Sequence, residues 1–182
     1  KCAVPILTAY RHNCFCMVGS FRSEAAHSKL VFTFLTSPQA QEYFSPGELA
    51  FIKQHLPKTF ALSSKNASFL EELLKRQQDY IIKPHNAYEG FGLYLGKNHS
   101  AGEWERLVHD NLDSNYIAQE AIAIPKQAFM LEPGKVKELS FNTSPYLYNG
   151  KMTGFYTRAS ETEVISTARG AALVPTLIST SG

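Results

Sequence analysis

The chain has few cysteines and no long apolar run, and each absence excludes a class of protein. Three of its 182 residues are cysteine, at Cys2, Cys14 and Cys16, all near one end. An odd count with no partner elsewhere argues against a disulfide framework, so we expect a reducing, cytoplasmic setting. Because no apolar stretch is long enough to span a bilayer, we expect no membrane partner.

The chain also lacks a surplus of charge. Its 18 lysines and arginines stand against 16 aspartates and glutamates, for a formal net charge of +2, and they form no basic arm. We therefore expect no nucleic-acid partner. The hydrophobic content of 44% is enough to build a core, which fits one large domain or two small lobes.

Two common catalytic patterns are missing as well. The six histidines show no metal-ligand spacing, and no serine lies in a nucleophile-elbow motif, which excludes a zinc enzyme or a triad hydrolase of the usual kind. Cys14 and Cys16 alternate on what reads as a strand, so both thiols would face one side. That pattern favours two packed small side chains over a metal site.

Helices and strands follow one another in an order typical of an α+β fold. Residues 3 to 18 read as two extended runs around a polar turn. Helical spacing or capping signals then predict helices at 30–35, after Ser45 and Pro46, after Asn66 and after Ser100. Residues 60 to 120 read as helix, strand, glycine turn, strand, helix and strand, with the last strand at 116–124, and so predict a compact lobe.

Short strands dominate the rest of the chain. They are predicted at 136–141, 146–148, 152–158, 164–166 and 172–178. Asn149-Gly150 is the strongest hairpin signal, so the strands on either side of it should pair in antiparallel fashion.

The segment from Asp79 to Gly96 suits a polyphosphate ligand. Lys83 stands at a strand end, Pro84 stops the strand, and Gly90 and Gly92 let the main chain approach a ligand closely. Lysine supplies a point charge for phosphate, and loop amides supply donors. An ordinary hairpin with an exposed lysine accounts for the same residues equally well.

The order of five stretches resembles the circularly permuted branch of the ATP-grasp superfamily, which includes glutathionylspermidine-synthetase-like proteins. The stretches are Ser20–Lys29, Leu56–Thr59, Tyr80–Pro84 with its glycine loop, Tyr116–Glu120, and Gly154–Arg158 with Arg169-Gly170. The resemblance implies an ATP-grasp-like fold, with a small α+β lid lobe beside a mostly antiparallel sheet with flanking helices. Its parts would be residues 1–59, the nucleotide-lid lobe at 60–120, and a sheet at 121–182 that completes the core.

The resemblance also covers only the later part of such an enzyme. The chain opens on Lys1, without an initiator methionine. We therefore expect it to belong to a longer protein.

The resemblance implies ATP and magnesium as cofactors and assigns a set of site residues. Arg158 matches an arginine at the phosphate or acyl-phosphate end and is the expected catalytic residue. The expected cofactor-binding residues are Lys83, Gly90, Gly92, Gln119, Glu120 and Ile122. The backbone of Ala121 and Ile122 would meet adenine, and Glu120 a ribose hydroxyl.

Several side chains of the expected site also suit a purely structural role. Glu120 could be a solvated carboxylate at a strand end, and Arg158 could form an ion pair with Glu161 or Glu163. Lys29, on a partly apolar helix, is better interpreted as a snorkelling side chain than as a ligand contact.

The chain departs from the family where magnesium would bind. Gly19, Asn142, Ser144 and Ser166 stand where oxygen ligands are expected, so the metal ligands are unknown, and Glu89 adds a carboxylate to the phosphate loop. Two main functions follow. One is a ligase that joins a carboxylate to an amine or thiol through an acyl phosphate; the other is a degenerate ATP-grasp module that acts as a binding or scaffold domain. A third is an interaction domain that keeps only the fold.

Overall fold

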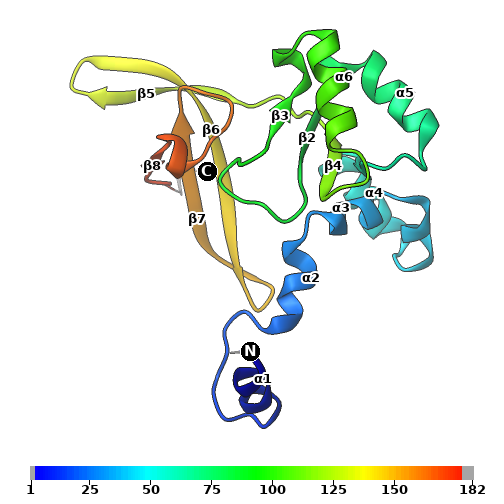
Figure 1. Cartoon of the computed structure of the whole chain (residues 1–182). Coiled ribbons are helices and arrows are strands. Elements are labelled where there is room, and N and C mark those ends of the chain that lie inside the picture. The colour runs from blue at the N-terminus through cyan, green and yellow to red at the C-terminus, as the bar shows by residue number, and fades with distance from the viewer. Residues whose placement is uncertain (1–2, 178–182) are drawn as a thin grey trace.

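The computed structural model describes residues 3–177, which fold around two four-stranded antiparallel sheets (Figure 1). The first sheet has the order β1-β4-β2-β3, and the second has the order β5-β6-β7-β8. The strands of the first are β1 Thr59–Ala61, β2 Tyr80–Pro84, β3 Tyr94–Leu95 and β4 Tyr116–Glu120. Those of the second are β5 Lys126–Glu132, β6 Lys135–Tyr148, β7 Lys151–Ser160 and β8 Ala172–Val174. The predicted α+β class is confirmed.

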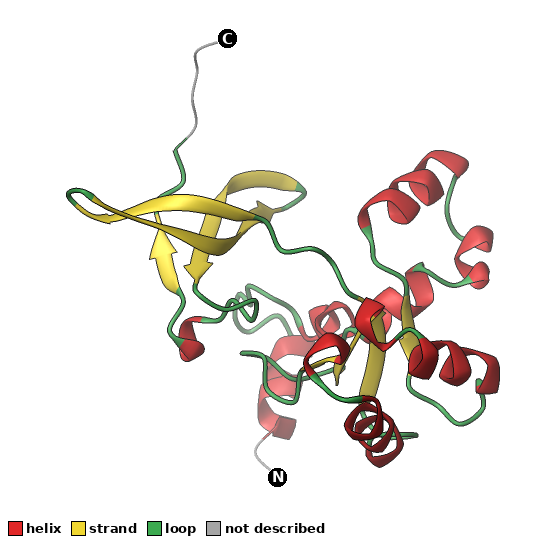
Figure 2. Cartoon of the chain, turned by 90° about the horizontal axis from the view of Figure 1, so that it is seen from above, coloured by secondary structure: helices red, strands yellow, loops and turns green. Residues whose placement is uncertain are grey.

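Most of the helices lie on the side of the first sheet, whereas the second sheet stands apart from them (Figure 2). The α-helices are α1 Ala3–Arg11, α2 Glu24–His27, α3 Leu30–Leu35, α4 Pro46–His55, α5 Ala67–Lys75 and α6 Ala101–Asp110. The helix α1 lies away from the first sheet (Figure 1). Short 3₁₀ segments are η1 Phe21–Ser23, η2 Pro38–Glu42, η3 Gln77–Asp79, η4 Gly96–Asn98 and η5 Thr167–Arg169. None of the helices within residues 3–177 is long and apolar enough to cross a membrane.

The capping signals in the sequence locate three helix starts correctly. Ser45 and Ser100 each form a complete capping box with the glutamate three residues later. Asn66 accepts a hydrogen bond from the Phe69 N–H and so caps α5. These helices begin where side chains satisfy otherwise unpaired backbone groups.

The beginning of the chain is helical, and the two strands predicted over residues 3 to 18 are wrong. α1 buries none of its residues, and the Thr8 hydroxyl donates to the Val4 carbonyl one turn earlier. With no neighbouring strand to pair with, the β-branched residues there satisfy their backbone locally. Cys14 and Cys16 lie exposed after the helix, so the packed pair is also wrong, and Cys2 lies outside the described residues.

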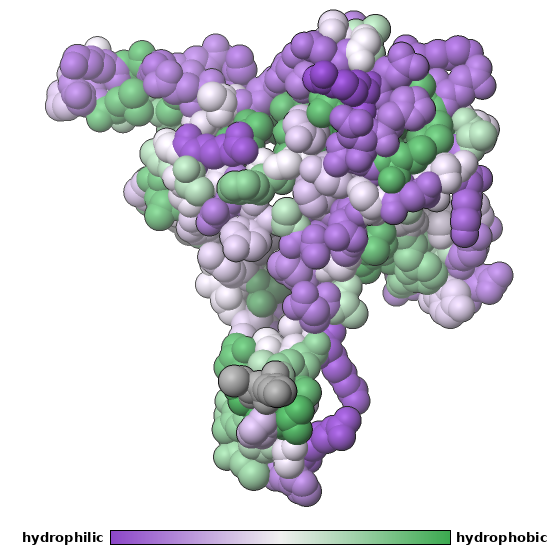
Figure 3. Space-filling view, viewed as in Figure 1, coloured by the Kyte–Doolittle hydropathy of each residue, from purple (hydrophilic) through white to green (hydrophobic). Residues whose placement is uncertain are grey.

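The exposed surface of α1 is made largely of apolar side chains (Figure 3). Val4, Ile6 and Leu7 on this helix are all exposed. The helix therefore contributes nothing to the buried core.

The main core lies between the first sheet and helices α5 and α6. Its buried members are Leu62, Phe69, Leu73, Tyr80, Ile82, Trp104, Val108 and Ala118. Trp104 is fully buried, and its indole N–H donates to the Leu73 carbonyl of α5 at 3.1 Å. β2, the strand that carries Lys83, is thus held in place by this core.

The second sheet differs from its prediction in several strands. β6 is one strand of 14 residues where two were predicted, because β7 pairs with it from Ser140 to Tyr148, whereas β5 pairs with it only as far as Ser140. Beyond that point β6 has one free edge, and such an edge tolerates Pro145. Residues 164–166 form no strand, β8 stops at Val174, and Ile178 lies outside the described residues. β5 was not predicted.

The predicted Asn-Gly hairpin is confirmed. Asn149 and Gly150 have φ values of 51° and 76°, and Tyr148 pairs with Lys151 across the turn. Positive φ at both central residues is the geometry that this dipeptide favours.

The two sheets are joined by residues 121–125, of which 121–124 were predicted as the end of a strand. β4 stops at Glu120 because its partners stop there: β1 pairs up to Gln119, and β2 begins at Tyr80 opposite Glu120. The linker then runs across to the second sheet (Figure 1).

Candidate functional site

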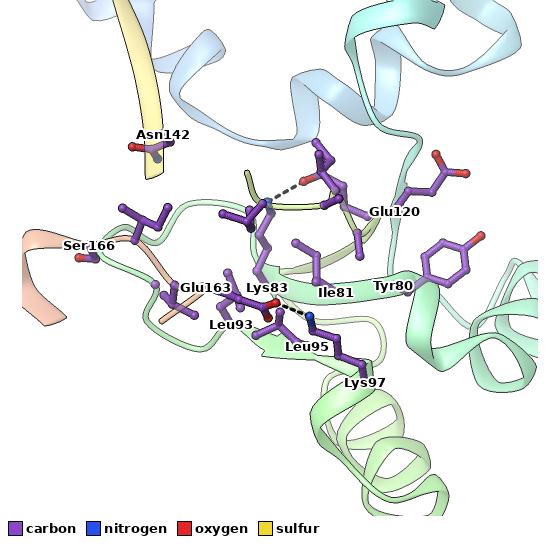
Figure 4. A pocket seen from close by; sticks show the side chains of 18 of the residues that line it. Tyr80, Ile81, Lys83, Leu93, Leu95, Lys97, Glu120, Asn142, Glu163 and Ser166 are labelled. Atoms are coloured by element: carbon purple, nitrogen blue, oxygen red, sulfur yellow. Dashed lines mark hydrogen bonds and ion pairs between the residues drawn. The ribbon is translucent and has the colours of Figure 1, made fainter. Parts of the chain in front are cut away.

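A cavity of about 840 Å³ lies between the two sheets (Figure 4). β2 and β4 contribute one wall, together with the loop of residues 85–92, which we call the glycine loop, and the linker. Asn142 of β6, Arg158 of β7 and residues 163–167 contribute the other wall. Pockets for cofactors and other small molecules commonly have volumes of about 300–1,000 Å³.

The cavity brings together six of the seven site residues expected from the sequence. They are Lys83, Gly90, Gln119, Glu120, Ile122 and Arg158. Gly92 is not among the lining residues: it has a φ of 65°, and a Cβ there would come within 2.6 Å of the Tyr116 hydroxyl. Gly92 therefore lets the glycine loop pack against the first sheet.

Lys83 occupies the centre of the site in a chain of hydrogen bonds. Its Nζ donates to Gln119 Oε1 at 2.7 Å, and Gln119 Nε2 in turn donates to Thr59 Oγ1 at 2.7 Å. Since Gln119 and Thr59 are both buried, the amide is held in one orientation. In the view of Figure 4, Lys83 is drawn between Ser166 on one side and Glu120 on the other.

Burial, and then repulsion by Lys29, lower the pKa of Lys83 from 10.5 to about 8. Among residues 3–177, no carboxylate forms an ion pair with this ammonium. The site thus holds a positive charge that an anionic ligand would neutralise.

The lowered pKa predicts a pH-dependent effect of Lys83 on stability. Between about pH 8 and 10.5 the unfolded chain holds the proton that the folded chain has lost, so this residue's contribution to stability rises with pH. We expect Lys83→Met to raise the free energy of unfolding relative to wild type at pH 7, and this advantage to shrink towards pH 9.5. Urea unfolding at several pH values measures the trend. An equal trend for Lys75→Met, at an exposed ion pair, would contradict the prediction.

The glycine loop is anchored from two sides. Lys29 Nζ donates to the Ala87 carbonyl, and Arg169 donates to the carbonyls of Glu89 at 3.3 Å and Gly90 at 2.9 Å. The interpretation of Lys29 as a snorkelling side chain is therefore wrong, and burial lowers its pKa. Three carbonyls of the glycine loop thus accept hydrogen bonds from the cationic side chains of Lys29 and Arg169.

Only part of the expected donor set in this loop is free. The N–H groups of Phe91 and Leu93 donate within the loop, to Tyr88 and Gly90. Gly90 has a φ of 72°, and a Cβ there would meet Val164 at 2.6 Å, so a glycine is needed for close contact with the second wall.

Arg158 contacts neutral groups rather than an acid. Its Nε donates to Asn142 Oδ1 at 3.3 Å, and its guanidinium carbon lies 5.3 Å from the centre of the Tyr156 ring. The alternative ion pairs are wrong, because Glu161 pairs with Lys137 and Glu163 with Lys97. Most of the donor fork of Arg158 remains available to a ligand.

The hinge end of the cavity is built on the end of β4. Glu120 Oε2 accepts from the Lys58 N–H at 3.2 Å, so this carboxylate is held by the backbone and is not simply solvated. Ile122 is 63% exposed. The Ala121 N–H donates to the Asp79 carbonyl, so it is not the free donor that adenine recognition would need.

The residues present do not fit a magnesium ion. Within residues 3–177, no three side chains among His, Cys, Asp and Glu gather into a group that could hold a metal. Glu163 forms an ion pair with Lys97, and Asn142 Oδ1 accepts a hydrogen bond from Arg158. Both side-chain oxygens nearest the positions expected for metal ligands are therefore already engaged. No step of the chemistry is therefore assigned to a metal.

Two contacts that shape the site have no signal in the local sequence. Lys97 meets Glu163 across the cavity, as Figure 4 shows, and Arg169 binds the glycine loop. The partners lie 66 and 79 residues apart in the chain. No local pattern could have paired them.

Comparison with models of known protein families gives no match, and comparison with curated proteins gives none either. The functional proposal therefore rests on the geometry of the cavity.

Proposed function

We propose that the chain binds ATP in the cavity between its two sheets, as an ATP-grasp-like part of a ligase. Such an enzyme joins a carboxylate to an amine or a thiol through an acyl phosphate. The observation that carries this proposal is the convergence of Lys83, Gln119, Glu120 and Arg158 on one cavity of about 840 Å³. These residues come from both sheets and from positions far apart in the chain.

The charges in the cavity suit a phosphate chain. Lys83 and Arg158 have no acidic partner among the described residues, and Lys97 and Glu163 neutralise each other. An anion between the two free cations would form charge-assisted hydrogen bonds in a partly dry site. Glu89, on the exposed side of the loop, works against this and lowers the expected affinity.

A second candidate function is a binding module without ligase activity. It is favoured by the engagement of Glu163 with Lys97 and of Glu161 with Lys137, which occupies two acids near the end of β7 that could otherwise hold a metal. Because acyl-phosphate formation demands strong neutralisation of the developing charge, a site that lacks these ligands would bind a nucleotide without turning it over.

Titration calorimetry with ATP tests the proposal. We expect binding that weakens about tenfold or more in Lys83→Met, the loss of one charge-assisted contact. Lys75→Met is the matched control, because Lys75 is an exposed lysine paired with Glu71 on α5, and it should leave the affinity unchanged. Absence of ATP binding, with and without magnesium, would overturn both candidates.

Magnesium separates the two candidates. Affinity that rises with magnesium, together with ADP production when carboxylates and amines or thiols are supplied, supports the ligase. Equal affinity with and without magnesium supports the module that only binds.

A further inference from the structure

Lys83 differs in its surroundings from the described lysines that form ion pairs. Lys75, Lys97, Lys135 and Lys137 each pair with a carboxylate and are largely exposed. Lys83 is half-buried, has only the Gln119 amide oxygen as a partner, and is repelled by Lys29. Desolvation next to a second cation lowers the pKa of a lysine and so raises the fraction of neutral, nucleophilic amine near neutral pH.

The amine is also oriented. Gln119 offers its oxygen to Lys83 because its own amide nitrogen is fixed on Thr59 Oγ1. A neutral amine that donates one N–H to this oxygen keeps its lone pair and its second N–H for the cavity. Figure 4 shows the Lys83 side chain reaching this oxygen beside the open space of the cavity.

The walls around the amine have an apolar part, a cationic part and three carboxylates, Glu89, Glu120 and Glu163. Apolar side chains of Ile81, Leu93, Leu95, Ile124 and Val164 line part of the cavity. Arg158 lines the same cavity from the second sheet and uses one N–H on Asn142. A ligand in this cavity could place an anionic group on the Arg158 guanidinium and another group beside the Lys83 amine.

We infer that Lys83 is a nucleophilic amine that forms an imine with an aldehyde carrying a phosphate or carboxylate group, which Arg158 binds. The Nζ lone pair attacks the carbonyl carbon and forms a carbon–nitrogen bond. The carbonyl oxygen leaves as water with the two amine protons, so the step needs no oxidant or reductant.

This inference goes beyond nucleotide binding and does not require it. A cavity that binds ATP through an ammonium can expose the same residue as an amine when the nucleotide is absent. The imine and the nucleotide would then exclude each other, because both use Lys83.

Labelling of the full chain with pyridoxal 5′-phosphate, followed by borohydride reduction, tests the inference. Peptide mass spectrometry then gives the labelling rate of each lysine in the wild-type protein, so no variant has to fold. Each unit by which an amine pKa falls raises its neutral fraction about tenfold, so at pH 7.5 we expect Lys83 to react at least about ten times faster than Lys75. Equal rates at the two positions would overturn the inference.

Pyridoxal, which lacks the phosphate, tests the anionic part. We expect it to label Lys83 more slowly than the phosphorylated aldehyde, and Arg158→Gln to slow labelling by the phosphorylated aldehyde alone. Equal rates for the two aldehydes in wild type would overturn the assignment of Arg158.

Addition of ATP separates this inference from the proposed function. Fast labelling of Lys83 that ATP does not slow, with no calorimetric binding, leaves the imine standing and removes the nucleotide. Calorimetric ATP binding with Lys83 labelled no faster than Lys75 leaves the nucleotide and overturns the imine.

Discussion

Replacement of Gly96 by alanine should destabilise the protein by at least about 3 kcal/mol, at the upper end of the cost of overpacking a core. Gly96 is buried at the junction of β3 and η4, and a Cβ there would overlap the backbone carbonyl of Gln77. The backbone on both sides is fixed, since the Gln77 side chain donates to the carbonyls of Gly96 and His99. Urea unfolding measures the loss.

Gly102 supplies the matched control for this prediction. It lies in α6, six residues further along, and a Cβ there has nothing within 4 Å. Gly102→Ala should stabilise the protein by up to about 1 kcal/mol, because alanine loses less conformational freedom in a helix. A Gly96→Ala variant as stable as Gly102→Ala would show that the packing of β3 on η3 is looser than described.

Truncation of Trp104 to alanine should cost about 3–5 kcal/mol of unfolding free energy. The indole is fully buried in the main core, and its loss would also leave the Leu73 carbonyl without its donor. Chemical denaturation followed by circular dichroism measures the effect, because Trp104 is the only tryptophan and its fluorescence disappears with it.

Phe51→Ala is the corresponding control at an exposed aromatic. Phe51 lies on α4 with 62% of its surface exposed, so its removal should change stability by no more than about 0.5 kcal/mol. A small effect at Trp104 comparable with that at Phe51 would contradict the assignment of the core to α5, α6 and the first sheet.

Local signals predicted those parts of the fold that depend on neighbours in sequence. Ser45 and Ser100 determine helix starts through their own side chains, and Asn149-Gly150 determines a turn through its backbone preference. The hairpin that carries Lys83 was predicted for the same reason. Residues 3 to 18 were assigned wrongly, because β-branched side chains favour a strand only where another strand is present to pair with.

The candidate site was predictable only in part. The cavity gathers Lys83, Gln119, Glu120 and Arg158, which a resemblance in the order of motifs had singled out. The engagement of Glu163 by Lys97 depends on how two sheets meet, and no spacing in the sequence encodes that. Sequence alone did not predict β6 as one continuous strand, because a proline usually interrupts a strand. Pro145 is tolerated only because β5 stops pairing at Ser140 and leaves that edge of β6 free.

The anchoring of the glycine loop links the two sheets mechanically. Arg169 holds the loop from the segment that follows β7, whereas Lys29 holds it from the segment that leads into α3. The loop itself is continuous with β2 of the first sheet. A change in the separation of the sheets would therefore deform this loop or break its bonds to Arg169, so while these bonds hold, widening the cavity also reshapes its rim.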